Sequence, residues 1–262
     1  MGQEPAGGLS RGGAEALRND AGEAGLTLYV HAPYRINVAS TDNKIRVPSR
    51  DLFQRQVNAA AEIGAAGLVV HGGHVGSGAD PPRSGFENWY KAVDRLEMPI
   101  PVLIENTAGG ENAMARTLDR LEQLWAAIAA ANGSENVGFC LDTCHAHAGG
   151  NEMAGLVERV RAITGRIDLV HFNDSRDAFD SGADRHANLG TGHIAVEDLV
   201  AVATAADAPL LLETPPGPAL TTPAMCSGSR SMWPTEDAEV PATLTLMATA
   251  LVTGGTAGIG AT

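Results

Sequence analysis

Six short apolar runs recur along the chain, and each of them ends in a histidine, an aspartate or a glutamate. Each run is five or six residues long and rich in valine, leucine and isoleucine, which is typical of a buried strand. The runs "LTLYVH", "GLVVH", "IPVLIE", "VGFCLD", "IDLVH" and "PLLLE" end at His31, His71, Glu105, Asp142, His171 and Glu213. Successive runs end between 29 and 42 residues apart, which is close to the length of one strand–helix unit.

The segments between the runs have the period of an amphipathic helix, with apolar residues on one face. "SRDLFQRQVNAAAEIGAA" begins with a candidate helix cap, Ser49. "NAMARTLDRLEQLWAAIAAAN" carries an apolar stripe that consists of Met114, Leu118, Leu121, Trp125 and Ile128. "EMAGLVERVRAITG" and "IAVEDLVAVATAA" have the same pattern. Strands that alternate with helices predict an α/β fold with a parallel sheet.

The polar residues that end the runs predict one shared site. A single acid or histidine at a strand end is as often a cap or a satisfied core residue, but six of them in register favour a common function. In a parallel barrel the active site lies at the C-terminal ends of the strands, where all six residues fall. A complete barrel has eight strands, and the sequence contains six clear ones. We therefore expect an incomplete TIM-type (β/α) barrel.

Three further residues extend this candidate site. His145 follows Asp142 by three positions, just past a strand end. In "GADRHANLG", Asp184 and His186 are two positions apart, and alternate residues of an extended segment point to the same side. The resulting set of five histidines, two aspartates and two glutamates is too large for one tetrahedral ion and suits two or three ions. Mixed imidazole and carboxylate ligands favour zinc, with manganese or iron as alternatives.

Composition restricts the partners and the location of the protein. The net charge of the 262-residue chain is -13, which argues against a broad basic surface for nucleic acid. Three divalent ions among four carboxylates would nevertheless leave a local positive charge that attracts phosphate. No apolar stretch is long enough to span a membrane, the first residues do not resemble a signal peptide, and the three cysteines form no even framework. These features favour the cytoplasm.

The motifs around these residues resemble those of a known family. They are, in order, "VHAPYRINVAS", "VHGGHVGSG", "LIENTAGG", "CLDTCHAHAGG", "LVHFNDSRDAFDSGADRHANLGTGHI" and "LLLET". They look like the motifs of endonuclease IV (deoxyribonuclease IV, AP endonuclease family 2), and the resemblance runs from about Leu26 to Thr214. It implies a xylose-isomerase-like barrel and a zinc-dependent endonuclease that cleaves double-stranded DNA 5' to abasic sites in base excision repair. The implied products carry a 3'-hydroxyl and a 5'-deoxyribose phosphate.

The resemblance also assigns roles to the candidate ligands. His31 and His71 would hold one zinc ion, which Glu105 would bridge to a second. The second ion would also take Asp142, His171 and Glu213. The third ion would take His145, Asp184 and His186. Glu105, Asp142 and Glu213 would be catalytic, with Glu213 orienting or deprotonating the attacking water, and manganese is a possible substitute metal.

Two residues are expected to contact DNA. Tyr34 matches a family residue that lies against DNA at the lesion. Arg185 stands between two candidate ligands, and two interpretations of it stay open: it contacts a phosphate, or it is a solvated loop residue. The protein is expected to act as a monomer.

The two ends of the chain depart from the family pattern. Residues 1–25 are expected to form a lead-in with one poor helix, residues 26–216 the partial barrel, and residues 217–262 an irregular tail. The tail ends in "ALVTGGTAGIGAT", which resembles the first strand and turn of a short-chain dehydrogenase, with Gly254, Gly258 and Gly260 in the turn. A dinucleotide site also needs the helix that follows such a turn. Our hypothesis is therefore that a truncated nuclease is joined to a non-functional remnant.

Two alternatives to an active nuclease stay open. Sugar isomerases and epimerases also use histidine, aspartate and glutamate at the strand ends of such a barrel, but one or two ions suffice for them. The third ligand group, His145, Asp184 and His186, favours the nuclease. The other alternative is an inactive fragment, because an open barrel leaves unpaired backbone at its edges.

Overall fold

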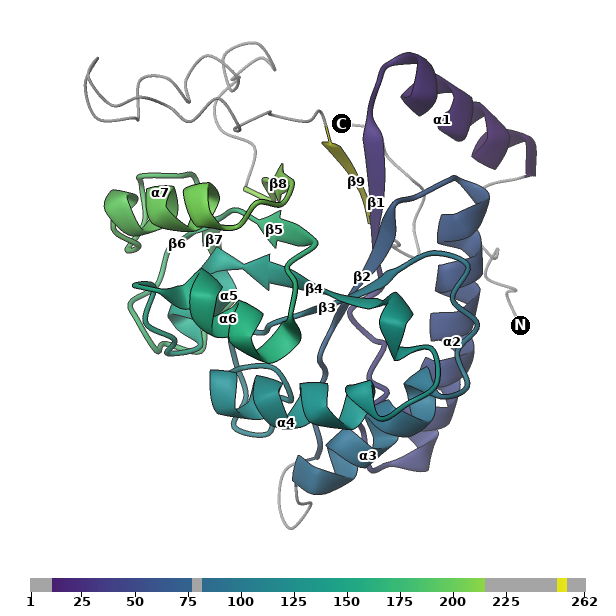
Figure 1. Cartoon of the computed structure of the whole chain (residues 1–262), viewed down its shortest axis with the longest axis horizontal. Coiled ribbons are helices and arrows are strands. Elements are labelled where there is room, and N and C mark those ends of the chain that lie inside the picture. The colour runs from purple at the N-terminus through teal and green to yellow at the C-terminus, as the bar shows by residue number, and fades with distance from the viewer. Residues whose placement is uncertain (1–10, 77–81, 215–248, 254–262) are drawn as a thin grey trace, which may run out of the picture.

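Parallel strands form one curled sheet in the computed structural model, which describes residues 11–76, 82–214 and 249–253. The sheet has the order β8-β5-β4-β3-β2-β1-β9, and each neighbouring pair is parallel (Figure 1). Its strands are β1 (Thr27–His31), β2 (Gly67–His71), β3 (Val102–Glu105), β4 (Val137–Asp142), β5 (Leu169–His171), β8 (Leu210–Leu211) and β9 (Thr249–Thr253). All six strands expected from the apolar runs are present, and the α/β barrel-type fold is confirmed.

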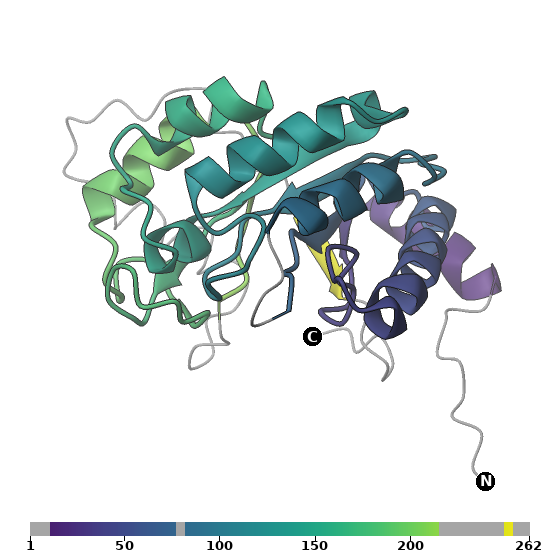
Figure 2. The same cartoon turned by 90° about the horizontal axis from the view of Figure 1, so that it is seen from below.

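Helices alternate with most of the strands along the chain and lie around the outside of the curled sheet (Figures 1 and 2). They are α1 (Arg11–Glu23), α2 (Asn43–Glu62), α3 (Pro82–Val93), α4 (Leu118–Ala129), the 3-10 turn η1 (Ser134–Asn136), α5 (Thr143–Ala148), α6 (Leu156–Thr164) and α7 (Val196–Ala205). A separate antiparallel ribbon consists of β6 (Asp174–Ser175) and β7 (His186–Ala187). Among the described residues, no helix has both the length and the apolar character needed to cross a membrane.

The alternation of side chains along each strand divides the core into an inner and an outer layer. The inner layer is a buried cluster of one residue from each of six strands: Tyr29, Val69, Leu103, Cys140, Leu169 and Leu211. Each of these residues precedes a candidate ligand by two positions, so the ligand points to the same inner side. The alternate strand residues, such as Leu68 and Ile104, pack in the outer cluster with Phe53, Trp89 and Leu121 of the helices. The apolar inner layer therefore lies directly below the candidate ligands, which follow it by two positions on each strand.

The start of α2 differs from the prediction. The helix begins at Asn43, where the side chain of Asp42 caps it by accepting a 2.8 Å hydrogen bond from the backbone N–H of Lys44. Ser49 lies inside the helix and is buried, and its hydroxyl accepts a 3.0 Å hydrogen bond from the backbone N–H of Asn37. The prediction of Ser49 as the cap is therefore wrong. The helix continues through Pro48 to Glu62, and Phe53, Val57 and Ala60 bury its inner face in the core.

The expected helix over residues 112–132 is also shorter than predicted. It begins only at Leu118, and the residues before it form a loop that is bonded to the segment after β2. Met114 belongs to this loop, where its backbone N–H donates to the carbonyl of Gly73 at 2.8 Å. Its side chain is fully buried. Met114 is buried in the loop four positions before Leu118, which is the spacing of one face of a helix. For this reason the apolar pattern predicted a helix that starts too early.

Strand β9 lies along the free edge of β1, in register from Thr27 opposite Thr249 to His31 opposite Thr253 (Figure 1). The strand expected at "ALVT" is thus present, as a parallel neighbour of β1. The sheet curls far enough to bring β9 into contact with β8 at the other end of the strand order. Gly254, Gly258 and Gly260 lie outside the described residues, so the predicted glycine turn stays a prediction.

Candidate metal centre

All nine candidate ligands converge at the C-terminal ends of the strands, as the sequence predicts. Their nitrogen and oxygen atoms form overlapping groups in which the atoms lie within 4.8 Å of one another. The groups are His31–His71–Glu105, Glu105–Asp142–His171–Glu213, His31–His171–Glu213 and Asp142–His145–His186. Asp184 joins the last of these through distances of 3.0 Å to Nε2 of His145 and 3.4 Å to Nε2 of His186.

Glu105 at the end of β3 is shared between two sides of the cluster. Its Oε2 lies 2.9 Å from Nε2 of His31 and 3.1 Å from Nε2 of His71. Its Oε1 lies 3.0 Å from Nδ1 of His171 and 3.2 Å from Nδ1 of His145. Burial would raise the pKa of this carboxyl, but the imidazoles of His171 and His71 outweigh burial and hold the pKa well below its ordinary value. Glu105 is therefore an ionised, fully buried carboxylate with imidazoles on both oxygens.

Asp142 and Glu213 supply the other carboxylates of the same group. Asp142 ends β4 and is fully buried, and burial raises its pKa in spite of the nearby His145 and His186. Glu213 lies two residues beyond the end of β8, and its Oε2 is 3.0 Å from Nδ1 of His171. Burial would raise the pKa of Glu213, but His171 lowers it below the ordinary value.

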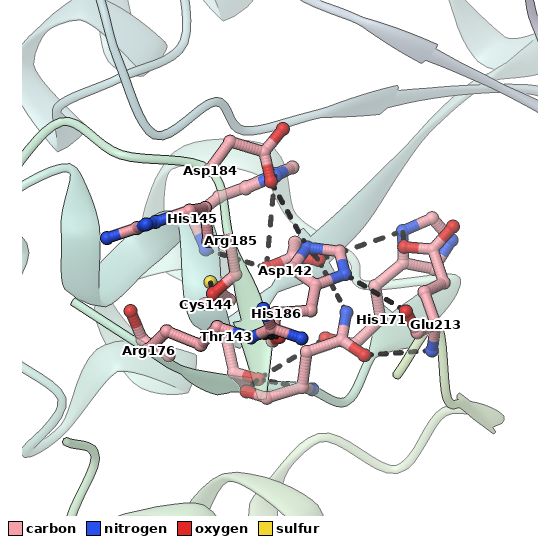
Figure 3. A network of polar contacts seen from close by, with 12 residues as sticks. Asp142, Thr143, Cys144, His145, His171, Arg176, Asp184, Arg185, His186 and Glu213 are labelled. Carbon is pink, nitrogen blue, oxygen red and sulfur yellow. Dashed lines mark hydrogen bonds and ion pairs between the residues drawn. The ribbon is translucent and has the colours of Figure 1, made fainter. Parts of the chain in front are cut away.

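The third group comes from two short elements after the strands. Helix α5 begins directly after Asp142, whose Oδ1 caps it by accepting from the backbone N–H of His145 at 2.6 Å. The imidazole of His145 is thereby placed on the inner side of the cluster. Ribbon strand β7 carries His186, and the loop before it carries Asp184, which is half exposed. Figure 3 shows Asp142 in the middle of these side chains, with Asp184 at one end and Glu213 at the other.

Backbone carbonyls orient three of the imidazoles. Nδ1 of His31 lies 2.8 Å from the carbonyl of Ala32, Nδ1 of His145 lies 2.9 Å from that of Asn106, and Nδ1 of His186 lies 3.3 Å from that of Glu213. A proton on each Nδ1 would leave the lone pair of Nε2 facing the cluster. Metal-binding histidines are typically held in this way.

The cluster has the features of a site that holds metal ions. Within the described part of the chain, Nε2 of His171 is buried and has no hydrogen-bond partner. The buried Nε2 atoms of His145 and His186 face a carboxylate oxygen of Asp184, at 3.0 and 3.4 Å. Leaving an atom such as Nε2 of His171 unpaired in the interior is costly, as is burying the carboxylates of Glu105 and Asp142 away from water. Divalent cations would bind the unpaired nitrogen and compensate the charge of the buried carboxylates. Zinc accepts a donor set of imidazole nitrogens and carboxylate oxygens.

The two expected DNA contacts lie near the cluster. Tyr34 is 80% exposed, and its ring lies 5.4 Å from the ring of His71 in an edge-on arrangement. The guanidinium of Arg185 forms an ion pair with Asp177, and it donates to Asp177 Oδ2 from Nε at 2.8 Å. Neither contact with DNA is tested by this geometry, so both stay predictions.

Sequence reasoning missed the asparagines that hold the ligands. The side chain of Asn106 exchanges two hydrogen bonds with the backbone of Asp142, at 2.8 and 2.9 Å. Asn173 bonds the side chain of Asp142 and the backbone of Glu213. The available signal was their position, one and two residues after a strand-end ligand. An asparagine at such a place is equally typical of a turn, so the signal alone was weak.

Comparisons with known proteins agree with this architecture. Residues 2–226 match the protein family described as "Xylose isomerase-like TIM barrel". The crystal structure of endonuclease IV from Thermus thermophilus superposes with a TM-score of 0.69 at 29% identity, over 86% of this chain and 81% of that one. A D-tagatose 3-epimerase-like protein superposes with a TM-score of 0.66 at 19% identity, over 85% and 82%, which shows a shared fold alone.

The family match over residues 2–226 and the curled parallel sheet, with its histidines and carboxylates at the strand ends, identify this chain as a xylose isomerase-like TIM barrel. A relative within that class is the "Probable endonuclease 4" of Mycobacterium ulcerans (strain Agy99), which is 56% identical over 200 residues, 75% of this chain and 77% of that protein. The chain therefore belongs to the endonuclease IV family of xylose isomerase-like TIM barrels.

Proposed function

We propose that this protein is a zinc-dependent endonuclease that cleaves double-stranded DNA 5' to abasic sites, leaving a 3'-hydroxyl and a 5'-deoxyribose phosphate. The observation that carries the proposal is the convergence of nine imidazole and carboxylate ligands at one end of the sheet. The identity of 56% with a protein named probable endonuclease 4 supports the same activity.

The ligand groups suit three ions. His31, His71 and Glu105 would hold one ion, and Glu105 would share a second with Asp142, His171 and Glu213. His145, Asp184 and His186 would hold the third. Bound zinc would lower the pKa of a water molecule and stabilise the negative charge that develops on the phosphate, and manganese is a possible substitute.

Glu213 is the residue best placed to accept a proton. Its side chain is 17% exposed, whereas those of Glu105 and Asp142 are buried. Glu213 would therefore orient or deprotonate the attacking water, while Glu105 and Asp142 would hold the ions in place.

Two exposed side chains would contact DNA. Tyr34 projects beside His71, and its aromatic ring offers a stacking surface for a base or sugar at the lesion. Arg185 is paired with Asp177 next to two candidate ligands, and its guanidinium would contact a phosphate of the bound DNA. The local charge of the loaded site would offset the acidic net charge of the chain.

The similarity to an epimerase-like protein leaves a second candidate function, a metal-dependent sugar isomerase or epimerase. That activity would not require the third ligand group. An inactive fragment is the remaining alternative. The experiment described next distinguishes the isomerase or epimerase and the inactive fragment from an active nuclease.

The test combines metal content with DNA incision. We expect about three zinc ions per chain by elemental analysis, and EDTA-sensitive cleavage 5' to a single abasic site in a duplex oligonucleotide, with no cleavage of the undamaged duplex. His71→Ala should abolish incision. His193→Ala, which changes an exposed histidine outside the ligand groups, should not. Metal-loaded protein that leaves the abasic duplex intact would contradict the proposal, and size-exclusion chromatography with light scattering would test whether it is a monomer.

A further inference from the structure

Asn173 connects three segments of the metal centre: the ends of β4 and β5 and the residues after β8. It lies two residues after His171 at the end of β5, directly before β6, and it is fully buried. Its side-chain Nδ2 donates to Asp142 Oδ2 at 2.8 Å, and its Oδ1 accepts from the backbone N–H of Glu213 at 2.8 Å. One amide thus connects β4, β5 and the segment after β8.

The backbone of Asn173 is fixed by Thr143 at the start of α5. The N–H of Asn173 donates to the Thr143 hydroxyl at 2.9 Å, and the carbonyl of Asn173 lies 2.5 Å from the same oxygen. The Thr143 hydroxyl also lies 3.3 Å from the carbonyl of His171. Because Thr143 follows Asp142 directly, the position of the amide is tied to the carboxylate that it bonds.

Asp142 has little freedom once Asn173 is in place. Its Oδ1 accepts from the backbone N–H of His145 at 2.6 Å, and its Oδ2 accepts from Asn173. Each oxygen thereby uses one acceptor position on the protein and keeps another for a cation.

Glu213 depends on Asn173 for a different reason. Strand β8 is only Leu210–Leu211, so the sheet does not hold the backbone of Glu213 directly. Its N–H is held by Asn173, and its carbonyl faces Nδ1 of His186 at 3.3 Å. Loss of the Asn173 bond would free the segment that carries the candidate proton acceptor.

We propose that Asn173 is a positioning residue that sets the orientation of Asp142 and Glu213 together and thereby the metal affinity of the group Glu105–Asp142–His171–Glu213. The inference rests on the proposed function in taking this group as a metal site. Asparagine suits the position because its uncharged amide offers both an N–H donor for Asp142 and an oxygen acceptor for the backbone of Glu213. Aspartate has the same size and keeps the acceptor, but it would place a second carboxylate against Asp142.

Asn173→Asp separates the role in metal binding from a general role in the fold. We expect the variant to bind zinc roughly 10–100-fold more weakly at this group, as is found for residues that support metal ligands. The group formed by His145, Asp184 and His186 should keep its ion. Cobalt-substituted protein should show a changed visible absorption spectrum, because the spectrum reports the ligand geometry around the ion.

Asn88→Asp is the matched control. Asn88 is a buried asparagine on α3, and its Nδ2 donates to the carbonyls of Ala39 and Ser40 at 3.1 Å rather than to a ligand residue. The melting temperature of each variant in EDTA measures its fold without metal. Asn88→Asp should lose stability but keep the wild-type zinc affinity and cobalt spectrum. Asn173→Ser, which is neutral and too short to bridge both partners, covers the case in which Asn173→Asp does not fold.

Wild-type zinc affinity and an unchanged cobalt spectrum in folded Asn173→Asp or Asn173→Ser would overturn the inference. These readouts need no DNA cleavage. Wild-type protein that loads metal but leaves abasic DNA intact would therefore overturn the proposed nuclease activity alone, and the Asn173 variants would still be judged by their metal affinity.

Discussion

Glu105 is the residue on which the metal centre depends most, because its two oxygens face the imidazoles of different ligand groups. Asp184, in contrast, is half exposed, and its carboxylate is paired with the two histidines of the third group. The two acids therefore differ in how many ions a neutral replacement should remove.

Glu105→Gln should lose two ions and Asp184→Asn only one. The glutamine keeps the size of the side chain but removes the charge shared by the first two groups, whereas the asparagine weakens the third group alone. Elemental analysis after dialysis against limiting zinc would count the ions that remain. Equal losses from the two variants would show that Glu105 does not bridge.

Cys140 and Cys144 should be unreactive in the folded protein. Both are buried and free, and burial raises the pKa of each thiol to about 12. Since the thiolate is the reactive form, neither should react with Ellman's reagent at pH 8. A Cys226→Ser background removes the remaining cysteine, and two thiols should then react only after unfolding. A thiol that reacts in the native protein would contradict this prediction.

At the scale of elements, β9 is the feature that the motifs of the nuclease do not explain. It extends the sheet beyond β1, and its register runs as far as His31, a candidate ligand. Unpaired backbone at a sheet edge favours association with other chains. Strand β9 therefore both covers the edge of β1 and braces the strand that carries one imidazole.

Removal of β9 should destabilise the protein. A chain that ends at residue 248 should melt several degrees below a chain that ends at residue 253, because only the longer one keeps β9. The comparison is controlled internally, since both chains lack the residues after the strand. The shorter chain should also aggregate more readily during refolding. Identical melting temperatures would show that the β1 edge does not need β9.

At the scale of the whole molecule, the fold and the metal centre depend on each other. The ligands come from β1, β2, β3, β4, β5, α5, β7 and the segments beside β7 and β8, so each ion would bind side chains that are distant in sequence. Such binding stabilises only the folded chain. Bound cations would also compensate the cost of burying the carboxylates of Glu105 and Asp142 at this end of the sheet.

Removal of metal should lower the melting temperature. Free zinc at one thousand times its dissociation constant stabilises a one-site protein by about 4 kcal/mol, and several sites add to this. Calorimetry with excess zinc and with EDTA would measure the difference. His71→Ala should reduce it and His193→Ala should leave it unchanged. A melting temperature that is the same with zinc and with EDTA would contradict the proposed metal centre.

The sequence alone determined the barrel-type fold and the convergence of the ligands. Valine- and leucine-rich runs that end in a polar residue are local patterns, and a parallel sheet necessarily gathers such ends on one side. Helix boundaries were predicted less well: α2 begins at the Asp42 cap and not at Ser49, and Met114 has the spacing of a helical residue but lies in a loop. These depend on packing between distant segments.

Only the tertiary structure decided how the ligands are held and what lies at the edge of the sheet. The contact of Asp184 with His145 and the joint made by Asn173 between β4, β5 and Glu213 depend on the curl of the sheet and on the path of its loops. Strand β9 pairs with β1 because β1 would otherwise lie at an edge of the sheet, which only the folded structure shows. The sequence determines which side chains face inward because strand period is a local property, whereas their partners depend on distances across the folded sheet.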